Sequence, residues 1–452
     1  MTGFYPPKPV PQQQKLGLLA RFNQGRYSTL NVLYDKVYSM KLGKFWSPRG
    51  KVYFAVEPAL TDEILRDPIR FPKSDLASSV LDQLLGQSIF VTNGQKWKKQ
   101  RQMMTPAFEH AGIHNAFEAM VDATNAMVKR LSPLANGEPF LIDHEMTHVT
   151  ADIIFRTIYS RPMTRQNSTI IFEAFNSYQE LAYAHSVWKM AGCPELLSPP
   201  RIRAKKYARI VRGLLERYVH ERVENNGGKR DILQSLMEAR DPDTGQGFSE
   251  SELVDQVGIM FLAGHETTAS ALSWALYLIS NVPDVSNRIR KEADAFWVEG
   301  AQFKNQRMLK YTRDVFREAM RLYPPVAMLP KDTIQPEKMR DKLISKGSLI
   351  FVSPWLSHRQ KKAWTDVDMF DPDRFSRQEE SKTIRERYMP FSKGPRVCLG
   401  ASFALQEAVL ILSSILYHFD ISVDENHVPE PVARLTLRPI NGVSIRLASR
   451  QR

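Results

Sequence analysis

The chain has 452 residues, 43% of them hydrophobic, and a formal net charge of +13. This length allows a large buried core but leaves the number of domains open. The positive charge would suit nucleic acid, an anionic membrane or an acidic protein partner. Because no basic cluster interleaved with aromatic residues is visible, we expect no nucleic-acid partner.

The N-terminal segment MTGFYPPKPVPQQQKLG lacks the basic-then-apolar order of a signal peptide. Its prolines favour an extended conformation, and we expect residues 1–29 to form an extended arm. Only two cysteines occur, Cys193 and Cys398, so we expect no disulfide framework and a reducing compartment. The sequence therefore predicts a soluble, cytoplasmic protein.

A first β-hairpin is expected around Ser47–Gly50, because Lys44–Trp46 and Val52–Val56 are rich in aromatic and branched residues. From about Gly112 to Tyr323 a helical pattern dominates. The first strands therefore precede a long helical region.

Two further hairpins are expected after the helical region. One is centred on Lys346-Gly347, with Leu349–Val352 as its return strand. The other is centred on Asn441-Gly442, a dipeptide typical of a type I′ turn. The sequence thus predicts strands near the two ends of the chain and helices between them.

The best-defined helix begins at Ser249, which forms a capping box with Glu252, while Phe248 and Leu253 occupy the positions of a hydrophobic staple. It ends near Pro283. Roughly thirty residues at about 1.5 Å each would span about 45 Å, so this helix should cross the interior of the molecule.

The longest apolar stretch, Val257–Ser280, lies within this helix and is interrupted by His265 and Glu266. Ionisable groups are costly in lipid, so we expect a buried helix of a soluble protein and no transmembrane anchor.

Cys398 lies in the segment FSKGPRVCLG, residues 391–400, directly before an apolar helical pattern over Ala401–Tyr417. Glycines on both sides suit a tight loop, and a helix N-terminus favours a thiolate, the form that binds metals. A lone cysteine without such a context is more often structural.

The segment resembles the haem-binding loop of cytochromes P450, Phe-x-x-Gly-x-Arg-x-Cys-x-Gly, at every fixed position. The resemblance implies that Cys398 is the axial ligand of a haem iron, that Arg396 pairs with a haem propionate and that Phe391 packs beside the sulfur. Gly394 and Gly400 are the glycines of the loop. A thiolate ligand favours cleavage of the O–O bond.

Within the long helix, residues 263–268 read AGHETT. A core helix with a few satisfied polar groups is one interpretation, and a zinc site is discounted because no second histidine follows at the required spacing. The segment resembles the oxygen-activating motif of the same family. Ala263 would leave room for dioxygen, and Glu266 and Thr267 would relay protons.

Glu318 and Arg321 form an i, i+3 pair that in isolation would usually lie on a solvated surface. They resemble the family's Glu-x-x-Arg, and the segment FDPDRF resembles the one that supplies a second arginine, Arg374. The resemblance implies that these three side chains form a buried network supporting the cysteine loop.

Trp97 and Arg101 match the family's Trp-x-x-x-Arg, which holds a haem propionate, although a basic amphipathic turn would have the same pattern. One departure is Lys331, where many relatives have an arginine that would meet a propionate. The sequence leaves open whether Lys331 replaces that arginine.

The resemblance extends from about Leu30 to Leu447 and implies a mainly α fold with a small β-rich lobe, the cytochrome P450 fold. It further implies a single haem domain over residues 1–452 with no fused reductase, binding haem b and using dioxygen as cosubstrate.

Electrons from NAD(P)H would arrive through a reductase and a ferredoxin or flavodoxin-like protein. We expect a monomer, and we expect Lys98, Lys99 and Lys393 to be exposed and to attract that acidic donor.

The expected function is monooxygenation of an apolar organic substrate, by hydroxylation or epoxidation. We expect the substrate to contact apolar residues before the Trp97 helix, in the long helix and after the Glu-x-x-Arg helix, namely Leu85, Phe90, Leu262, Val326 and Ala327. A peroxygenase of the same fold is an alternative that the Glu266-Thr267 pair disfavours. A haem-binding protein without turnover is another, and substrate-dependent consumption of dioxygen would distinguish it.

Overall fold

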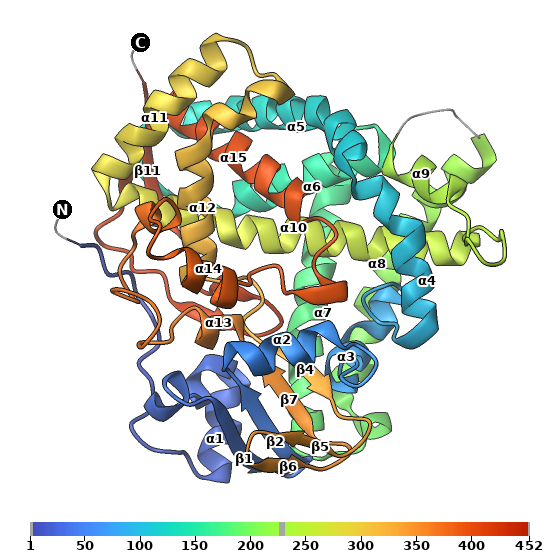
Figure 1. Ribbon diagram of the computed structural model, residues 1–452. Helices are drawn as coiled ribbons and strands as arrows, with labels where there is room; N and C mark the ends of the chain where they lie inside the picture. The colour runs from blue at the N-terminus through green and yellow to red at the C-terminus, as the bar shows by residue number, and fades with distance from the viewer. Residues whose placement is uncertain (1–2, 226–230, 451–452) are drawn as a thin grey trace.

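The computed structural model describes residues 3–225 and 231–450. Helices form the main body of the molecule, and small sheets lie at its edges (Figure 1). The α-helices, in chain order, are α1 Leu18–Tyr27, α2 Pro58–Arg66, α3 Asp75–Leu85, α4 Gly94–Met104, α5 His110–Leu131, α6 Asp143–Tyr159, α7 Arg165–Met190, α8 Pro199–Asn225, α9 Ile232–Glu238, α10 Glu250–Ser280, α11 Pro283–Val298, α12 Lys310–Leu322, α13 Pro354–Ser357, α14 Ser381–Arg387 and α15 Ala401–His418.

The strands form one four-stranded sheet, one three-stranded sheet and two two-stranded sheets in the described part of the chain. Their orders are β1-β2-β7-β4, β3-β11-β8, β10-β9 and β5-β6. The strands are β1 Leu42–Ser47, β2 Gly50–Ala55, β3 Asn136–Leu141, β4 Leu329–Asp332, β5 Glu337–Met339, β6 Lys342–Ile344, β7 Leu349–Val352, β8 Phe419–Val423, β9 Pro431–Ala433, β10 Leu437–Pro439 and β11 Ser444–Ser449. The predicted fold class, mainly α with a small β-rich lobe, is confirmed.

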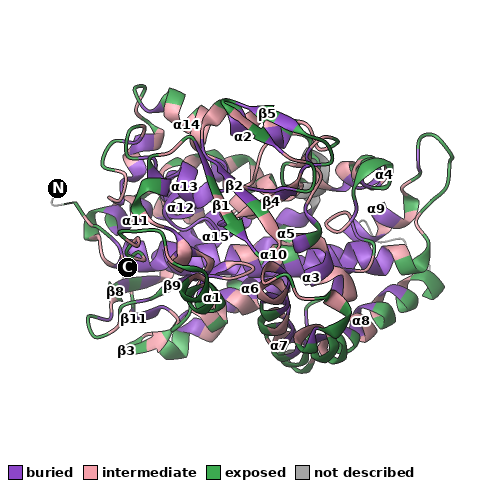
Figure 2. Ribbon diagram, turned by 90° about the horizontal axis from the view of Figure 1, so that it is seen from below, coloured by how far each residue is buried: buried purple, intermediate pink, exposed green. Residues whose placement is uncertain are grey.

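Helix α10 is the long central helix predicted from the sequence. The Ser249 side chain accepts a hydrogen bond from the Glu252 backbone N–H, and the Glu252 carboxylate accepts one from the Ser249 backbone N–H at 3.0 Å. The helix crosses the body of the protein and is coloured almost wholly as buried in Figure 2. Its central position brings the AGHETT segment into the interior.

The first predicted hairpin is confirmed, since β1 pairs antiparallel with β2 and Ser47 lies opposite Gly50. The second is wrong. Strand β7 pairs parallel with β2 and antiparallel with β4, while β6 pairs with β5. A parallel pairing needs a long crossover, which a local turn signal cannot reveal.

The third predicted hairpin is also wrong, because β10 pairs with β9, whereas β11 pairs with β3 and β8. A turn does form, with the Gly442 N–H donating to the Pro439 carbonyl at 3.1 Å. Gly442 has a φ of +75°, but Asn441 is not among the described residues with positive φ, as a type I′ turn would require.

The N-terminal arm is extended only in part. Residues 3–17 contain no helix, and they are held by contacts such as that of the Tyr323 hydroxyl with the Pro7 carbonyl at 2.6 Å. Residues 18–27 form helix α1, which corrects the expectation of an extended arm over residues 1–29. The prolines that favour extension all precede Leu18 in this region.

By length and composition, α15 is apolar enough to cross a membrane, alone among the helices of the described chain. However, 61% of that segment is buried inside the protein, as in the core helix of a globular fold. Helices α10, α12 and α15 pack against one another. Helix α10 and the loop before α15 line the same cavity.

Candidate functional site: a thiol-bearing cavity

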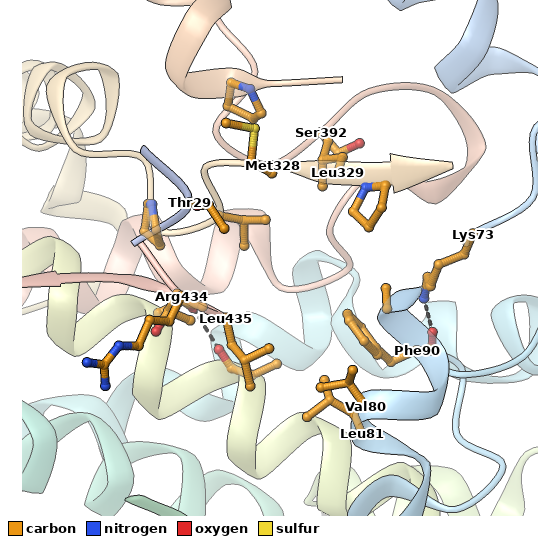
Figure 3. A pocket seen from close by; sticks show the side chains of 18 of the residues that line it. Thr29, Lys73, Val80, Leu81, Phe90, Met328, Leu329, Ser392, Arg434 and Leu435 are labelled. Carbon is orange, nitrogen blue, oxygen red and sulfur yellow. Dashed lines mark hydrogen bonds between the residues drawn. The ribbon is translucent and has the colours of Figure 1, made fainter. Parts of the chain in front are cut away.

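A cavity of about 740 Å³ lies between α10, the segment before α4, strand β4 and the loop that precedes α15. Figure 3 shows Lys73 and Phe90 on one side of it and Leu435 on another, with Met328 and Leu329 along its edge. Most of the lining side chains are apolar. A cavity of this size can hold a large flat cofactor or a small molecule.

The cysteine loop forms one wall of the cavity. The Cys398 backbone N–H donates to the Phe391 carbonyl at 3.0 Å, which closes the loop on itself. Gly394 has a φ of +72°, and a Cβ there would lie 2.5 Å from the Leu65 carbonyl oxygen. Only glycine permits both this conformation and this close approach, as the sequence motif predicts.

Cys398 opens onto the cavity, and Phe391 and Gly400 line the cavity beside it. Burial within the surrounding protein raises the pKa of the Cys398 thiol, while the Gly400 backbone N–H and the Arg101 guanidinium act in the opposite direction. The expected preference for thiolate is therefore outweighed by burial in the free protein. Coordination to a metal ion would remove the proton.

The predicted buried network forms behind this loop. Glu318, Arg321 and Arg374 are all 0% exposed. The Arg321 guanidinium donates to both Glu318 carboxylate oxygens at 2.8 Å, and Arg374 donates to one of them at 3.1 Å. These charges are paired, as burial of ions requires.

His358 connects this network to the cysteine loop, a link that the sequence motifs did not predict. Its Nδ1–H donates to the Arg321 carbonyl at 3.1 Å, and its Nε2 accepts from the Met389 backbone N–H at 2.9 Å. Burial, followed by the positive charges of Arg321 and Arg359, lowers the pKa of His358 well below its ordinary value. A neutral imidazole is what these two hydrogen bonds need.

Four basic side chains, which we call the cation cluster, line the cavity near the cysteine loop: Lys73, Arg101, Lys331 and Arg396. Within the described chain, none of them forms a salt bridge with a carboxylate. Lys73 and Lys331 belong to neighbouring segments joined by an isolated β-bridge. Burial, followed by the charge of Arg396, lowers the pKa of Lys331 to about 8.

The other members of the cluster bind neutral groups. The Arg396 guanidinium lies over the Trp97 ring at 4.1 Å and donates to the Asn93 side-chain oxygen at 2.7 Å, while its Nε–H has no partner. Arg101 donates to the Val397 carbonyl at 2.7 Å, and Lys73 donates to the Phe90 carbonyl. Cations that line a cavity without counter-charges indicate an anionic ligand.

The AGHETT segment of α10 faces the same cavity. Ala263, Glu266 and Thr267 line it, and the Thr267 hydroxyl donates to the Ala263 carbonyl at 2.6 Å. Glu266 is not free, because its carboxylate forms a salt bridge with Arg438 and accepts a hydrogen bond from the Thr436 hydroxyl at 2.8 Å. The C-terminal strands thus hold the predicted proton-relay acid.

Of the predicted substrate contacts, Leu85, Phe90, Leu262 and Val326 line the cavity. Ala327 does not. It is buried, and its carbonyl accepts a hydrogen bond from the Ser353 hydroxyl at 2.9 Å. Its side chain belongs to the buried hydrophobic core of the protein.

Two of the three lysines expected to be free for a donor protein are engaged. Lys99 forms a salt bridge with Asp241 at 2.9 Å. Lys393 is 17% exposed and binds the Asp62 carboxylate at 3.2 Å as well as two backbone carbonyls. Only Lys98 fits the expectation of a free, exposed lysine.

Sequence reasoning missed Lys73, His358, Arg438 and Glu407 as site residues. Glu407 offered a signal, since it is the one carboxylate in the apolar run Ala401–His418. The other three had none, because their partners lie far away along the chain.

The cavity suits a flat dianionic ligand such as haem, because a thiol faces its interior and unpaired cations line one wall. The propionates of haem would supply the missing negative charge, and the apolar walls would enclose the macrocycle. The chemistry of the site therefore agrees with the cofactor implied by the cysteine loop.

Comparison with known proteins points the same way. The chain matches the family model "Cytochrome P450" over residues 6–446. It is 27% identical to a cyclooctat-9-en-7-ol 5-monooxygenase of Streptomyces melanosporofaciens, covering 88% of this chain and 82% of that protein. It is 28% identical to cytochrome P450 4A7 of Oryctolagus cuniculus, covering 83% and 77%, and 28% identical to a cytokinin hydroxylase of Arabidopsis thaliana, covering 82% and 74%. Over nearly its whole length, the chain belongs to the cytochrome P450 family of haem-thiolate monooxygenases, which use haem b, dioxygen and electrons from a redox partner.

Proposed function

We propose that Cys398 is the axial ligand of haem iron in this cavity. The cation cluster would hold the propionates, with Trp97 supporting Arg396, and Lys331 would take the place of the arginine found in many relatives. The single observation that carries this proposal is the combination of one cavity-facing thiol with cavity-lining cations that lack counter-charges. The whole chain would then act as one haem domain.

Bound haem supplies a redox-active iron whose thiolate ligand favours cleavage of the O–O bond. The protein contributes the surroundings of that iron. Ala263 would leave room for dioxygen, Thr267 offers a hydroxyl within the cavity, and Glu266 precedes Thr267 as an acid held by Arg438. This acid-alcohol pair favours an oxygen-dependent cycle over the peroxygenase alternative.

The substrate that we propose is an apolar organic molecule, hydroxylated or epoxidised. Leu85, Phe90, Leu262 and Val326 would form its contacts, and the apolar majority of the lining supports this class. The relatives' names include a cyclooctat-9-en-7-ol monooxygenase and a cytokinin hydroxylase, which differ in substrate. A ligand screen read by the haem spin state would narrow the choice.

The electron donor that we propose is an acidic ferredoxin or flavodoxin-like protein, attracted by the exposed positive charge of Lys98. We place this reaction in the cytoplasm, in a monomer that acts without a membrane span. The free thiols Cys193 and Cys398 support a reducing compartment, and the burial of α15 supports its role as a core helix.

Replacing the ligand tests the proposal. Cys398→Ser should lose the carbon monoxide difference spectrum of a thiolate haem, whereas Cys193→Ser, the matched control, should keep it. If Cys398→Ser retained that spectrum, the assignment of the ligand would be wrong. If the purified wild type bound haem but consumed no dioxygen with a reductase and any substrate, the alternative of a haem-binding protein without turnover would replace the enzyme.

A further inference from the structure

The turn between β9 and β10 contributes three neighbouring side chains to the cavity lining: Arg434, Leu435 and Thr436. The Arg434 backbone N–H donates to the Thr436 carbonyl at 3.0 Å, which closes the turn. The residue before it, Ala433, is held from the segment after α1. The Thr29 hydroxyl donates to the Ala433 carbonyl at 3.1 Å, and the Ala433 N–H donates to the Ser28 hydroxyl at 3.1 Å. These bonds fix the position of Arg434 beside α1.

Arg434 is half-buried and has no counter-charge in the described chain. Its Nε–H donates to the carbonyl of Tyr27, the last residue of α1, at 3.3 Å, while its two terminal nitrogens form no hydrogen bond with a described residue. Glu430 is the nearest acid along the chain, but it accepts a hydrogen bond from the Tyr27 hydroxyl at 2.9 Å and forms no salt bridge with Arg434. The end of the guanidinium is therefore available to a ligand.

Arg21 is a second cation on the α1 side of the cavity lining. It donates to the Trp46 carbonyl at 2.9 Å, and its buried Nε–H has no partner. Like Arg434, it forms no salt bridge with any residue that the structure describes. The side of the cavity next to α1 thus carries positive charge that the protein itself leaves unpaired.

These two arginines are separate from the cation cluster. Figure 3 shows Arg434 on the opposite side of the cavity from Lys73, a member of that cluster. The haem propionates would neutralise the cluster, but they would leave the positive charge beside α1 without a partner. Glu266, an acid of the same lining, is already paired with Arg438. The unpaired charge therefore suits an anionic group on the substrate.

We propose that Arg434 selects the substrate by binding a carboxylate on an otherwise apolar molecule, with Arg21 adding to the positive potential. Two free terminal N–H groups on one guanidinium can bind the two oxygens of a carboxylate in parallel. The inference rests on the function proposed above and narrows its substrate class to apolar carboxylic acids.

The position of Arg434 also indicates which part of such a molecule would react. The Thr436 hydroxyl donates to Glu266 at 2.8 Å, and Glu266 directly precedes Thr267. Two residues of chain span at most about 7 Å, so the anchor and the oxygen-activating segment belong to neighbouring parts of one lining. A substrate held at Arg434 would extend its apolar part past Leu435 toward Thr267. We therefore expect oxidation at a carbon remote from the carboxylate.

The test measures binding to the haem-loaded wild type through the haem spin state. The probes are two apolar acids of different shape, dodecanoic acid and abietic acid, and the primary amide of each. At least one acid should bind about tenfold or more tightly than its amide, because a hydrogen bond to a charged group contributes that much. Raising the salt concentration to about 1 M should reduce this preference.

Three variants separate an anchor from a residue that only supports the hairpin. Arg434→Gln should lower the affinity for the acid about tenfold or more and leave that for the amide unchanged. Arg434→Lys should keep part of the preference, because it retains the charge but not the paired donors. Arg26→Gln removes an exposed arginine of α1 that is not part of the cavity lining, and it should keep the full preference. A purely structural role for Arg434 predicts equal losses for acid and amide.

Equal affinities of acid and amide in the wild type would overturn the inference while leaving the haem assignment intact. So would failure of both acids to bind a protein that shows the thiolate carbon monoxide spectrum, or a preference that persists in Arg434→Gln. If Arg434→Gln failed to load haem, Arg434→Lys would decide, since a reduced preference supports the anchor and an unchanged one overturns it. A wild type without the thiolate spectrum would overturn the haem assignment itself.

Discussion

The Nε2 atom of His358 accepts a hydrogen bond of 2.9 Å from the Met389 backbone N–H, two residues before Phe391. Through its other nitrogen His358 binds the Arg321 carbonyl, so the buried Glu318 network and the cysteine loop share one side chain. These two hydrogen bonds connect the segment that leads into the cysteine loop to the buried network.

Replacing His358 with leucine should destabilise the protein by about 1–3 kcal/mol, because it leaves a buried N–H and a buried carbonyl unpaired. His144→Leu, at an exposed position, is the control. Thermal melting measures the difference, and faster haem loss should accompany it. Equal melting temperatures for His358→Leu and the wild type would show that the link is not needed.

The same histidine predicts a dependence of stability on pH. The pKa of His358 in the folded protein lies well below the ordinary value of 6.5. As pH falls below 6.5 the unfolded chain therefore binds a proton that the folded protein does not, and stability decreases. Urea titrations of the wild type between pH 7 and 5 should show a steeper loss than those of His358→Leu. Parallel pH profiles would contradict the assignment.

Glu318→Ala should leave Arg321 and Arg374 buried without their shared carboxylate, at a cost of about 3–5 kcal/mol. Glu379→Ala removes an exposed acid nearby in sequence and should change stability by less than about 0.5 kcal/mol. Melting curves and haem content give the comparison. The network would lose its supporting role if Glu318→Ala melted and bound haem like the control.

Thr267→Ala should leave haem and substrate binding intact and divert reducing equivalents to peroxide. The Thr267 hydroxyl donates a hydrogen bond to the Ala263 carbonyl within α10 and does not bind a charged group there, so its removal leaves no buried charge unpaired. Ser270→Ala, which removes a buried hydroxyl one turn further along α10, is the control. The ratio of released peroxide to product tests this prediction. An unchanged ratio in Thr267→Ala would assign the proton relay to another group.

Lys331→Met should affect the haem-free and haem-bound proteins in opposite directions. In the haem-free protein it removes a buried cation that has no counter-charge, so stability should rise. In the haem-bound protein it removes a charge-assisted hydrogen bond worth roughly 1.5–3 kcal/mol, so haem should dissociate about tenfold faster or more. Haem transfer to an acceptor protein measures this rate. An unchanged rate would place the propionates away from Lys331.

Lys98→Glu should slow reduction by an acidic donor without altering the haem spectrum, and high salt should remove most of the difference. The Debye length shrinks from about 10 Å at 0.1 M to about 3 Å at 1 M, which screens an exposed charge. Lys338→Glu, an exposed reversal on β5, is the control. Reduction rates that respond equally to both reversals would exclude a docking role for Lys98.

The sequence by itself determined the features whose signals are local. The start of α10 follows from the Ser249 capping box, and the first hairpin follows from strand propensity around a turn. The cysteine loop needs a glycine at position 394 because the backbone there has positive φ and touches Leu65. The site residues carried by these motifs can therefore be predicted from the order of the amino acids alone.

Only the tertiary structure decided which distant groups meet. Arg438 reaches Glu266, and His358 joins Arg321 to Met389, across intervals that no periodicity or turn signal spans. The parallel pairing of β7 with β2, found where the sequence predicted a hairpin, likewise joins segments that lie far apart in the sequence. Charge state also depends on the fold, because burial is a property of the packed chain. Burial raises the pKa of Glu407 and of Cys398 and lowers that of Lys331, whereas the sequence shows only residue types.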